Sequence, residues 1–298
     1  MQTRLKRLTK LTRLRNREGI VAAAFLLPSS VGFAVFFLIP FLMGGYYSLV
    51  DTPIDGSFVG IANYEQLLAN PVFRRAAMNT LQFMGLCVPL NMGLALGLAM
   101  LLNRSMRFRE WFRIALLSPL VIPVASVVLV WAALFDLHGT LSGWLDQWGH
   151  PPQDWMESKA ALYVIILVYI WKNVGYNMIL FLAGLQQIPA DYYEAAAIDG
   201  AGKVRQWRSI TLVYLTPTTF FVFIMSIINS FKMFRETYML AGSYPAEKVY
   251  MLQHYMNNMF QSLDYQKLTS AAYIMAAVIT MLVWLLFRIE RKLRSALE

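Results

Sequence analysis

The chain has 298 residues, of which 58% are hydrophobic and 14% are charged, whereas soluble domains average about 45–50% apolar and about 25% charged residues. Its 26 basic and 17 acidic residues are too few to cover a soluble protein of this length, which excludes a soluble globular domain, a disordered chain and a disulfide-built scaffold. The single cysteine, Cys87, cannot form an internal disulfide, and the three histidines are too scattered for a zinc site. The sequence therefore predicts an integral membrane protein with no cofactor of its own.

Six apolar stretches predict membrane-spanning helices, because about 20 mainly apolar residues are needed to cross the hydrocarbon core. They cover residues 20–47, 78–102, 112–134, 160–185, 210–231 and 268–287. None shows the period-two alternation of barrel strands, so we expect an all-α integral membrane protein with six transmembrane helices. We assign residues 20–290 to one transmembrane domain, residues 1–19 to a basic N-terminal segment and residues 291–298 to a tail.

The lysines and arginines predict the orientation of these helices, because basic residues close to the spans stay in the cytoplasm. Of the 26 basic residues, 18 lie before the first span, after the last span, or in the loops after spans two and four. This bias predicts two cytoplasmic termini and explains the net charge of +9 by contact with membrane lipid, without a nucleic-acid partner. A signal peptide is the competing interpretation of the basic start, but the apolar run is too long and lacks a small-residue cleavage site.

The loop between spans four and five carries the most informative motif, IPADYYEAAAIDGAG at residues 188–202. Pro189 suits the first turn of a helix, and the acidic Asp191 and Glu194 suit its positive end. Three consecutive alanines give high helix propensity with little side-chain bulk, and Gly200 can take the left-handed conformation that ends a helix. We therefore expect a short helix at about residues 189–200, with a thin face and an acidic side chain for docking.

This motif resembles the EAA motif of ABC importer permeases, in which Glu-Ala-Ala precedes Asp-Gly-Ala and then Ile, Leu and Pro. The matching residues are Glu194, Ala195, Ala196, Asp199, Gly200, Ala201, Ile210, Leu212 and Pro217. Trp171, Gly175 and residues 182–189 look like the carbohydrate subgroup, of the maltose and glycerol-3-phosphate permease type. The resemblance covers all six spans in order and implies a type I ABC importer permease in a bacterial or archaeal cell membrane.

The resemblance also implies that the loop is a coupling helix that docks into a cytoplasmic ATPase, where Glu194 meets a basic residue. The implied coupling residues are Glu194, Ala195, Ala196, Asp199, Gly200 and Ala201. ATP and Mg²⁺ are expected on the ATPase, because residues 200–204 of this chain lack the upstream glycine and the following Ser or Thr of a P-loop. The other implied partners are a second, homologous permease and an extracellular binding protein that delivers a carbohydrate.

Polar stripes inside spans four and five predict a substrate passage, because polar groups in a bilayer usually face a cavity or a partner. The stripes consist of Tyr169, Lys172, Asn173 and Tyr176 in span four, and of Ser226, Asn229, Ser230 and Met233 in span five. The alternative is that these groups only join helices. Alignment with the maltose permease places the sugar-contacting positions at Lys172, Asn173, Tyr176, Ser226, Asn229, Ser230 and Met233. Only Tyr176 and Ser226 keep their residue type, so we expect a different substrate.

The charged residues near this passage leave the substrate class open. Lys172, Lys232 and Arg235 lie at or near it, and Glu236 is the acidic residue closest to them in sequence. A buried lysine without a counter-ion would favour an acidic saccharide or a sugar phosphate, whereas hydrogen bonds from Lys172 to hydroxyls would suit a neutral oligosaccharide.

Two other function classes are alternatives. A secondary, ion-coupled transporter would be expected to show an inverted repeat or paired broken helices, and an intramembrane serine hydrolase would need a Gly-x-Ser-x-Gly turn. We find neither signal in the sequence. Dependence of transport on an ATPase, rather than on an ion gradient, separates an importer permease from a secondary transporter.

Overall fold

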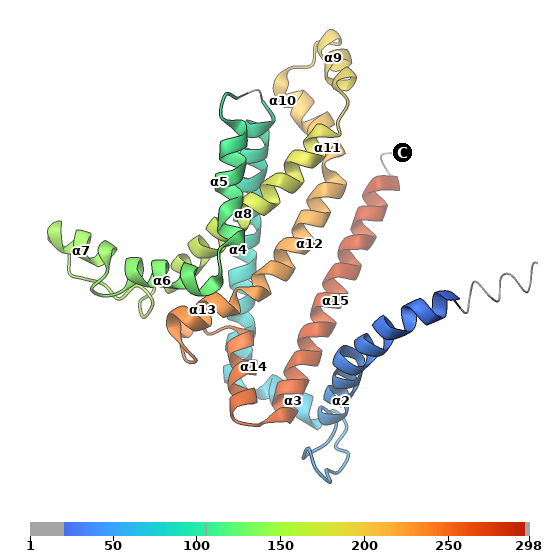
Figure 1. Cartoon of the computed structure of the whole chain (residues 1–298), viewed down its shortest axis with the longest axis vertical. Helices are drawn as coiled ribbons and strands as arrows, with labels where there is room; N and C mark the ends of the chain where they lie inside the picture. Colours follow the sequence, from blue (N-terminus) through green and yellow to red (C-terminus); the bar gives the residue numbers. More distant parts are fainter. Residues whose placement is uncertain (1–20, 105, 296–298) are drawn as a thin grey trace, which may run out of the picture.

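The computed structural model describes residues 21–104 and 106–295, and helices make up nearly all of it (Figure 1). The segments long and apolar enough to cross a membrane are Val21–Tyr47, Pro71–Asn103, Val124–Gln147, Ala161–Gln186, Thr216–Ala241 and Tyr265–Lys292. The prediction of an all-α fold with six spans is therefore confirmed. The predicted basic segment 1–19 and the last three residues of the predicted tail lie outside the described residues.

The helices follow one another along the chain, and the longest connections are those before α3 and before α8. The first helix ends in the π-helical turn η1 (Ala34–Leu38) and α2 (Ile39–Tyr47), followed by α3 (Ala62–Ala69), α4 (Pro71–Asn103), α5 (Arg109–Val121), α6 (Val124–Phe135) and α7 (Thr140–Gln147). Then come α8 (Ala161–Gln186), α9 (Ala190–Ile198), α10 (Lys203–Gln206), η2 (Trp207–Thr211), α11 (Leu212–Tyr214) and α12 (Thr216–Lys232). The chain ends with α13 (Phe234–Ala241), η3 (Glu247–Val249), α14 (Leu252–Gln261) and α15 (Tyr265–Ser295).

The third predicted span, residues 112–134, is not one helix. α5 ends at Val121 and α6 begins at Val124, and Figure 1 shows α6 turning aside from the direction of α5. The physical reason is Pro123, which has no backbone N–H and disfavours a helical conformation in the residue before it. Ile122 accordingly has an extended backbone, with φ −69° and ψ 131°.

The fifth predicted span, residues 210–231, starts too early. The short turns η2 and α11 precede α12, which begins at Thr216 with a proline in its first turn. Met233 then separates α12 from α13. The other four predicted spans agree with observed helices to within one residue or lie inside them, and α4 starts earlier than predicted, at Pro71.

α8 is the central helix, and it packs against α4, α5 and α12. Of its apolar stretch 61% is buried, compared with none of that of the first helix and 11% of that of α15. The ring of Phe83 on α4 meets the ring of Tyr169 on α8 edge-on, with centroids 5.7 Å apart. Tyr169 Oη also donates a hydrogen bond to the Ser226 carbonyl of α12 at 2.8 Å. The interior is therefore organised around α8, while the outer helices leave their apolar faces exposed.

The two ends of the molecule differ in charge. Figure 1 shows α9, α10, the α4–α5 connection and the C-terminal end of α15 toward one end, with α3 and α14 toward the other. The basic loops after spans two and four, which the sequence analysis placed in the cytoplasm, both lie at the first end. At the second end, two cations are paired with carboxylates, because Arg75 contacts Glu247 at 2.7 Å and Lys267 contacts Asp264 at 2.6 Å.

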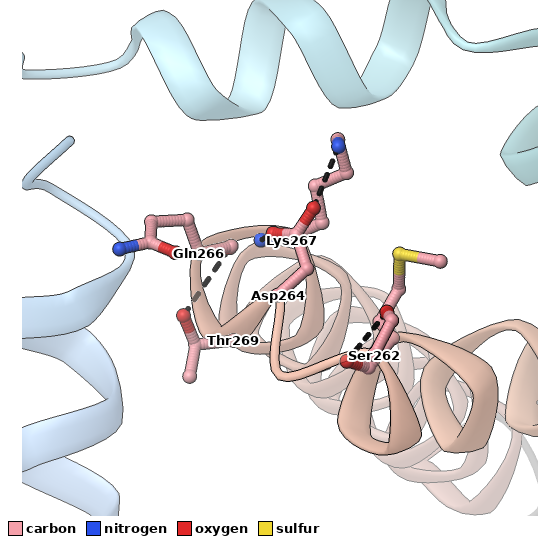
Figure 2. A network of polar contacts seen from close by, with 6 residues as sticks. Ser262, Asp264, Gln266, Lys267 and Thr269 are labelled. Carbon is pink, nitrogen blue, oxygen red and sulfur yellow. Dashed lines mark hydrogen bonds and ion pairs between the residues drawn. The ribbon is translucent and has the colours of Figure 1, made fainter. Parts of the chain in front are cut away.

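Figure 2 shows the turn that joins α14 to α15. Asp264 accepts hydrogen bonds from the backbone N–H of Lys267 at 3.1 Å and from its ammonium group at 2.6 Å. Thr269 Oγ1 donates to the Tyr265 carbonyl at 2.7 Å, and Leu263 has a positive φ of 60° where the chain reverses. These local contacts cap α15 and set the position of α14 beside it.

Side chains of α4 hold the connection that follows α13. Asn79 Nδ2 donates to the carbonyls of Glu247 at 2.7 Å and Tyr250 at 2.9 Å. The backbone N–H of Leu252 donates to Thr80 Oγ1 at 2.9 Å. Because the donor Asn79 and the acceptor Thr80 are both fixed on α4, the chain that leaves α13 is anchored there. α13 itself packs against α6.

Candidate functional site

α9 protrudes at one end of the molecule (Figure 1) and corresponds to the helix expected at about residues 189–200. Pro189 is its N-cap residue, Asp191 lies in its first turn, and none of its residues is buried. The prediction of a short exposed helix in this loop is confirmed.

The C-terminal end of α9 is closed by Gly200, whose φ is +78°. Its backbone N–H donates to the Ala197 carbonyl at 3.0 Å, and the N–H of Ala201 donates to the Ala196 carbonyl at 2.8 Å. These two bonds form a Schellman motif, in which glycine accepts the left-handed conformation without the steric penalty of a Cβ. Gly200 therefore sets the direction in which the chain leaves the C-cap residue, Asp199.

The predicted coupling residues differ in how far they are exposed to solvent. Glu194, Ala195, Asp199 and Gly200 are exposed, whereas Ala196 and Ala201 are half-buried against the capped turn. The Glu194 carboxylate has no ion-pair partner in the part of the chain that the structure describes. An exposed carboxylate beside alanine methyl groups can be approached closely by a cation of another protein.

Two tyrosines that the sequence analysis did not single out attach α9 to the rest of the chain. The hydroxyls of Tyr193 and Thr211 hydrogen-bond at 2.9 Å. The rings of Tyr192 and Tyr214 stack with centroids 5.1 Å apart. Thr211 belongs to η2 and Tyr214 to α11, so these two contacts tie α9 to the segment that leads into α12. In the sequence, the two adjacent tyrosines inside the motif could have indicated these contacts.

A cavity of about 290 Å³ lies at the break between α5 and α6. It is lined by Leu120, Ile122, Pro123, Val124, Lys172, Asn173, Asn229, Lys232, Met233, Arg235 and Glu236. The cavity brings together four predicted substrate residues: Lys172, Asn173, Asn229 and Met233. The broken third span supplies an apolar wall, and α8, α12 and α13 supply the polar one.

The other three predicted substrate residues, Tyr176, Ser226 and Ser230, do not line this cavity. Ser226 is fully buried, and its Oγ accepts a hydrogen bond from Asn177 Nδ2 at 2.8 Å. Ser230 Oγ donates to the Ile227 carbonyl at 2.7 Å, and Tyr176 is half-buried on α8. In this conformation the two serines take part in contacts within and between helices.

Asn177, which the sequence analysis missed, joins three helices through buried amides. Its Nδ2 donates to Asn91 Oδ1 of α4 at 2.7 Å and to Ser226 Oγ of α12 at 2.8 Å. Both asparagines are completely buried. A carboxamide inside an apolar span was the available signal, but it lies one position outside the predicted stripe.

Lys172 forms an ion pair with Glu236 of α13. The two side chains are 18% and 2% exposed, so the pair is largely shielded from solvent. The hypothesis of a lysine without a counter-ion is therefore wrong for Lys172, because the break at Met233 turns Glu236 toward α8. The second carboxylate oxygen, Glu236 Oε2, is buried and has no hydrogen-bond partner among the described residues.

Lys232 and Arg235 contribute two more positive charges to the cavity wall. Both are exposed, and neither has an ion-pair partner within residues 21–104 and 106–295. Because Lys172 and Glu236 neutralise each other, the wall keeps a net positive charge from these two side chains.

Residues 62–295 match the family model described as "Binding-protein-dependent transport system inner membrane component". The arabinooligosaccharides transport system permease protein AraP of Bacillus subtilis is 35% identical over 72% of this chain and 70% of its own length. The trehalose/maltose transport system permease protein MalF of Thermococcus litoralis is 30% identical over 78% of this chain and 81% of its own. The sulfoquinovosyl glycerol transport system permease protein SmoG of Agrobacterium fabrum is 29% identical, with coverages of 88% and 87%.

Solved structures show the same fold. A chain from a bacterial ABC transporter involved in the import of the acidic polysaccharide alginate superposes with a TM-score of 0.80, at 22% identity, over 95% of this chain and 99% of that one. The alginate transporter in complex with its alginate pentasaccharide-bound periplasmic protein gives 0.79 at 21% identity, with coverages of 93% and 96%. The family match, the relatives and the six apolar helices together show that this chain belongs to the binding-protein-dependent transport system inner membrane components, as a multi-pass permease subunit of an ABC importer.

Proposed function

We propose that this chain forms part of the transmembrane passage of an ATP-driven importer for a carbohydrate. The observation that carries the proposal is α9, an exposed helix capped by Gly200, whose Glu194 has no ion-pair partner among the described residues and which follows α8 directly. Relatives named for arabinooligosaccharides, trehalose and maltose, and sn-glycerol-3-phosphate support a saccharide or a related polyol as substrate.

The proposed assembly contains a second, homologous permease, an ATPase dimer and an extracellular binding protein. ATP and Mg²⁺ bind to the ATPase chains, which receive α9 in a cleft where Glu194 meets a cation. The concentration of basic residues at the α9 end supports a cytoplasmic location for that end and for both termini. The binding protein then delivers substrate at the opposite end, beside α3 and α14.

Closure of the ATPase dimer would move α9, and the chain offers two routes for that movement. One runs directly into α8, because only three residues separate the end of α8 from the start of α9. The other runs through Tyr193–Thr211 and Tyr192–Tyr214 toward α12. α8 carries Lys172 and Asn173, and α12 carries Asn229. Relative movement of these helices would therefore reshape the cavity and open it in turn to the two sides of the membrane.

The predicted substrate residues would act in succession. Lys172, Asn173, Asn229 and Met233 line the cavity and make the first contacts. Tyr176 and Ser226 lie about one turn closer to the α9 end on their helices, whereas Ser230 follows Asn229 on α12 and lies at the level of the cavity. Hydroxyl and carboxamide groups at these positions can exchange hydrogen bonds with saccharide hydroxyls as the substrate moves.

The complete transporter in proteoliposomes is expected to import at least one saccharide or related polyol, and only when ATP is supplied on the ATPase side. The panel of probes is arabinotriose, trehalose, maltose, sn-glycerol 3-phosphate and trimannuronate, each radiolabelled. Ionophores that collapse proton and sodium gradients should leave uptake unchanged, because the energy enters through α9. Uptake driven by an ion gradient without ATP would identify a secondary transporter, and import of no panel member would contradict the carbohydrate proposal.

Replacing Glu194 with alanine is expected to weaken binding of the ATPase at least tenfold, because the exposed α9 would lose its charged contact without losing its fold. A tenfold change corresponds to about 1.4 kcal/mol. Copurification of the ATPase and ATP-dependent uptake measure the effect. Asp146→Ala, which removes an exposed carboxylate from α7, is the matched control. A Glu194→Ala permease that retains its ATPase and transports normally would contradict the role of Glu194 in coupling.

A further inference from the structure

The charge of the cavity at the α5–α6 break bears on the class of substrate, and this inference rests on the proposed function. Three cationic side chains and one carboxylate line the cavity. The carboxylate, Glu236, is paired with Lys172. Lys232 and Arg235 therefore face the cavity without a counter-charge from the described part of this chain.

Three further acidic residues line a cavity that α13 also borders, but they do not pair with the two cations. Asp136, Asp154 and Glu157 line a separate cavity, which α13 borders with Leu240 and Ala241 at its far end. None of these carboxylates lies within ion-pair distance of Lys232 or Arg235. The three carboxylates therefore do not neutralise Lys232 and Arg235, and the cavity at the α5–α6 break keeps an excess of positive charge.

We propose that this cavity binds an anionic saccharide or an anionic polyol, whose carboxylate, phosphate or sulfonate group is held by Arg235 and Lys232. The guanidinium of Arg235 can donate two parallel hydrogen bonds to such a group, and Lys232 adds a point charge. An anion offsets the unfavourable exclusion of water from these two cations when the passage closes.

The remaining lining residues suit the saccharide itself. Asn173 Nδ2 donates one hydrogen bond to the Tyr169 carbonyl at 2.9 Å. The Oδ1 atom of the same carboxamide can accept a hydrogen bond from a saccharide hydroxyl. Asn229 offers a second carboxamide, and the wall at Ile122 and Pro123 offers an apolar surface for the C–H groups of a sugar ring. A volume of about 290 Å³ is at the small end of ligand pockets, which suits one charged sugar unit at a time.

Paired uptake measurements on the complete transporter test the proposal. The wild-type transporter is expected to import an anionic member of the panel, sn-glycerol 3-phosphate or trimannuronate. Arg235→Gln and Lys232→Gln should each raise the KM for that probe at least tenfold, whereas Arg235→Lys should keep part of the affinity. Any uptake of arabinotriose should stay unchanged, and so should the affinity of the isolated binding protein for the anionic probe.

Lys248→Gln is the matched control, because Lys248 is exposed on η3 and does not line the cavity. Import of neutral panel members alone would overturn the anionic substrate while leaving the proposed function intact. Equal loss of neutral and anionic uptake in Arg235→Gln and Lys232→Gln would also overturn it, since the cations would then act on the structure. ATP-dependent import of no probe at all would refute the proposed function and this inference together.

Discussion

Replacing Glu236 with alanine is expected to lower the free energy of unfolding by about 3–5 kcal/mol, because it leaves Lys172 as a shielded charge without its partner. The side chain of Glu236 is 2% exposed and that of Lys172 is 18% exposed, so water can replace the lost carboxylate only in part. The pair also joins α8 to α13 across the wall of the cavity, so ATP-dependent uptake should fall with stability.

The single cysteine provides the measurement for this prediction. Cys87 is completely buried in α4, so a maleimide labels it only when the surrounding helices open. In a transporter whose other subunits lack cysteine, the temperature at which Cys87 becomes labelled should drop in Glu236→Ala. The exposed ion pair between Arg75 and Glu247 gives the matched control, because Glu247→Ala should change this temperature little.

A double substitution separates the ion pair from the shape of the side chains. Lys172→Met combined with Glu236→Leu removes both charges and keeps most of the volume, so it should be more stable than Glu236→Ala. If the single and double variants unfold at the same temperature, the pairing of the two charges does not stabilise the fold, and the prediction is wrong.

The six spans and α9 could be predicted from the sequence because their signals are local. Hydropathy over about 20 residues decides whether a helix can cross a bilayer, whatever it packs against. The signals for α9 lie within residues 188–202: a proline and acidic residues at its start, alanines in its middle and Gly200 at its end. Each acts on the backbone nearby, so no tertiary contact was needed to locate the helix.

The break in the third span could not be predicted from the sequence, because a proline in an apolar stretch can either remain inside a helix or end it. α4 continues through Pro89 as one helix, whereas the chain leaves the helical conformation at Pro123. α4 packs along α8, and this packing keeps it continuous at the position where proline removes a hydrogen bond. The region after Pro123 instead turns aside and opens the cavity.

The pairing of Lys172 with Glu236 also could not be predicted from local sequence patterns. The two residues are 64 positions apart, and they meet only because the chain bends at Met233 and packs α13 beside α6. Sequence analysis identified every charged residue of the cavity but could not tell which cation would be neutralised. In the structure Lys172 is neutralised by Glu236, and the excess positive charge of the cavity comes from Lys232 and Arg235.

Gly175→Ala is expected to disrupt the packing of α5 on α8 and to destabilise the fold by about 1–3 kcal/mol or more. A Cβ at this position would lie 1.9 Å from the carbonyl oxygen of Leu116 and 2.5 Å from its carbonyl carbon. Both atoms belong to the backbone of α5, so no side-chain rotation can relieve the overlap, and α5 must move away as a whole. Labelling of Cys87 should therefore begin at a lower temperature.

Glycines on α4 provide the matched control, because alanine raises helix propensity by about 1 kcal/mol where space allows. A Cβ at Gly93 would meet nothing within 4 Å, so Gly93→Ala should be neutral or stabilising in the same assay. α5 also carries Leu120 and leads to Pro123 in the cavity wall, so Gly175→Ala should reduce uptake even at temperatures where the protein stays folded. If Gly175→Ala behaves like Gly93→Ala in both labelling and uptake, the close approach of α5 to α8 does not hold the apolar wall in place.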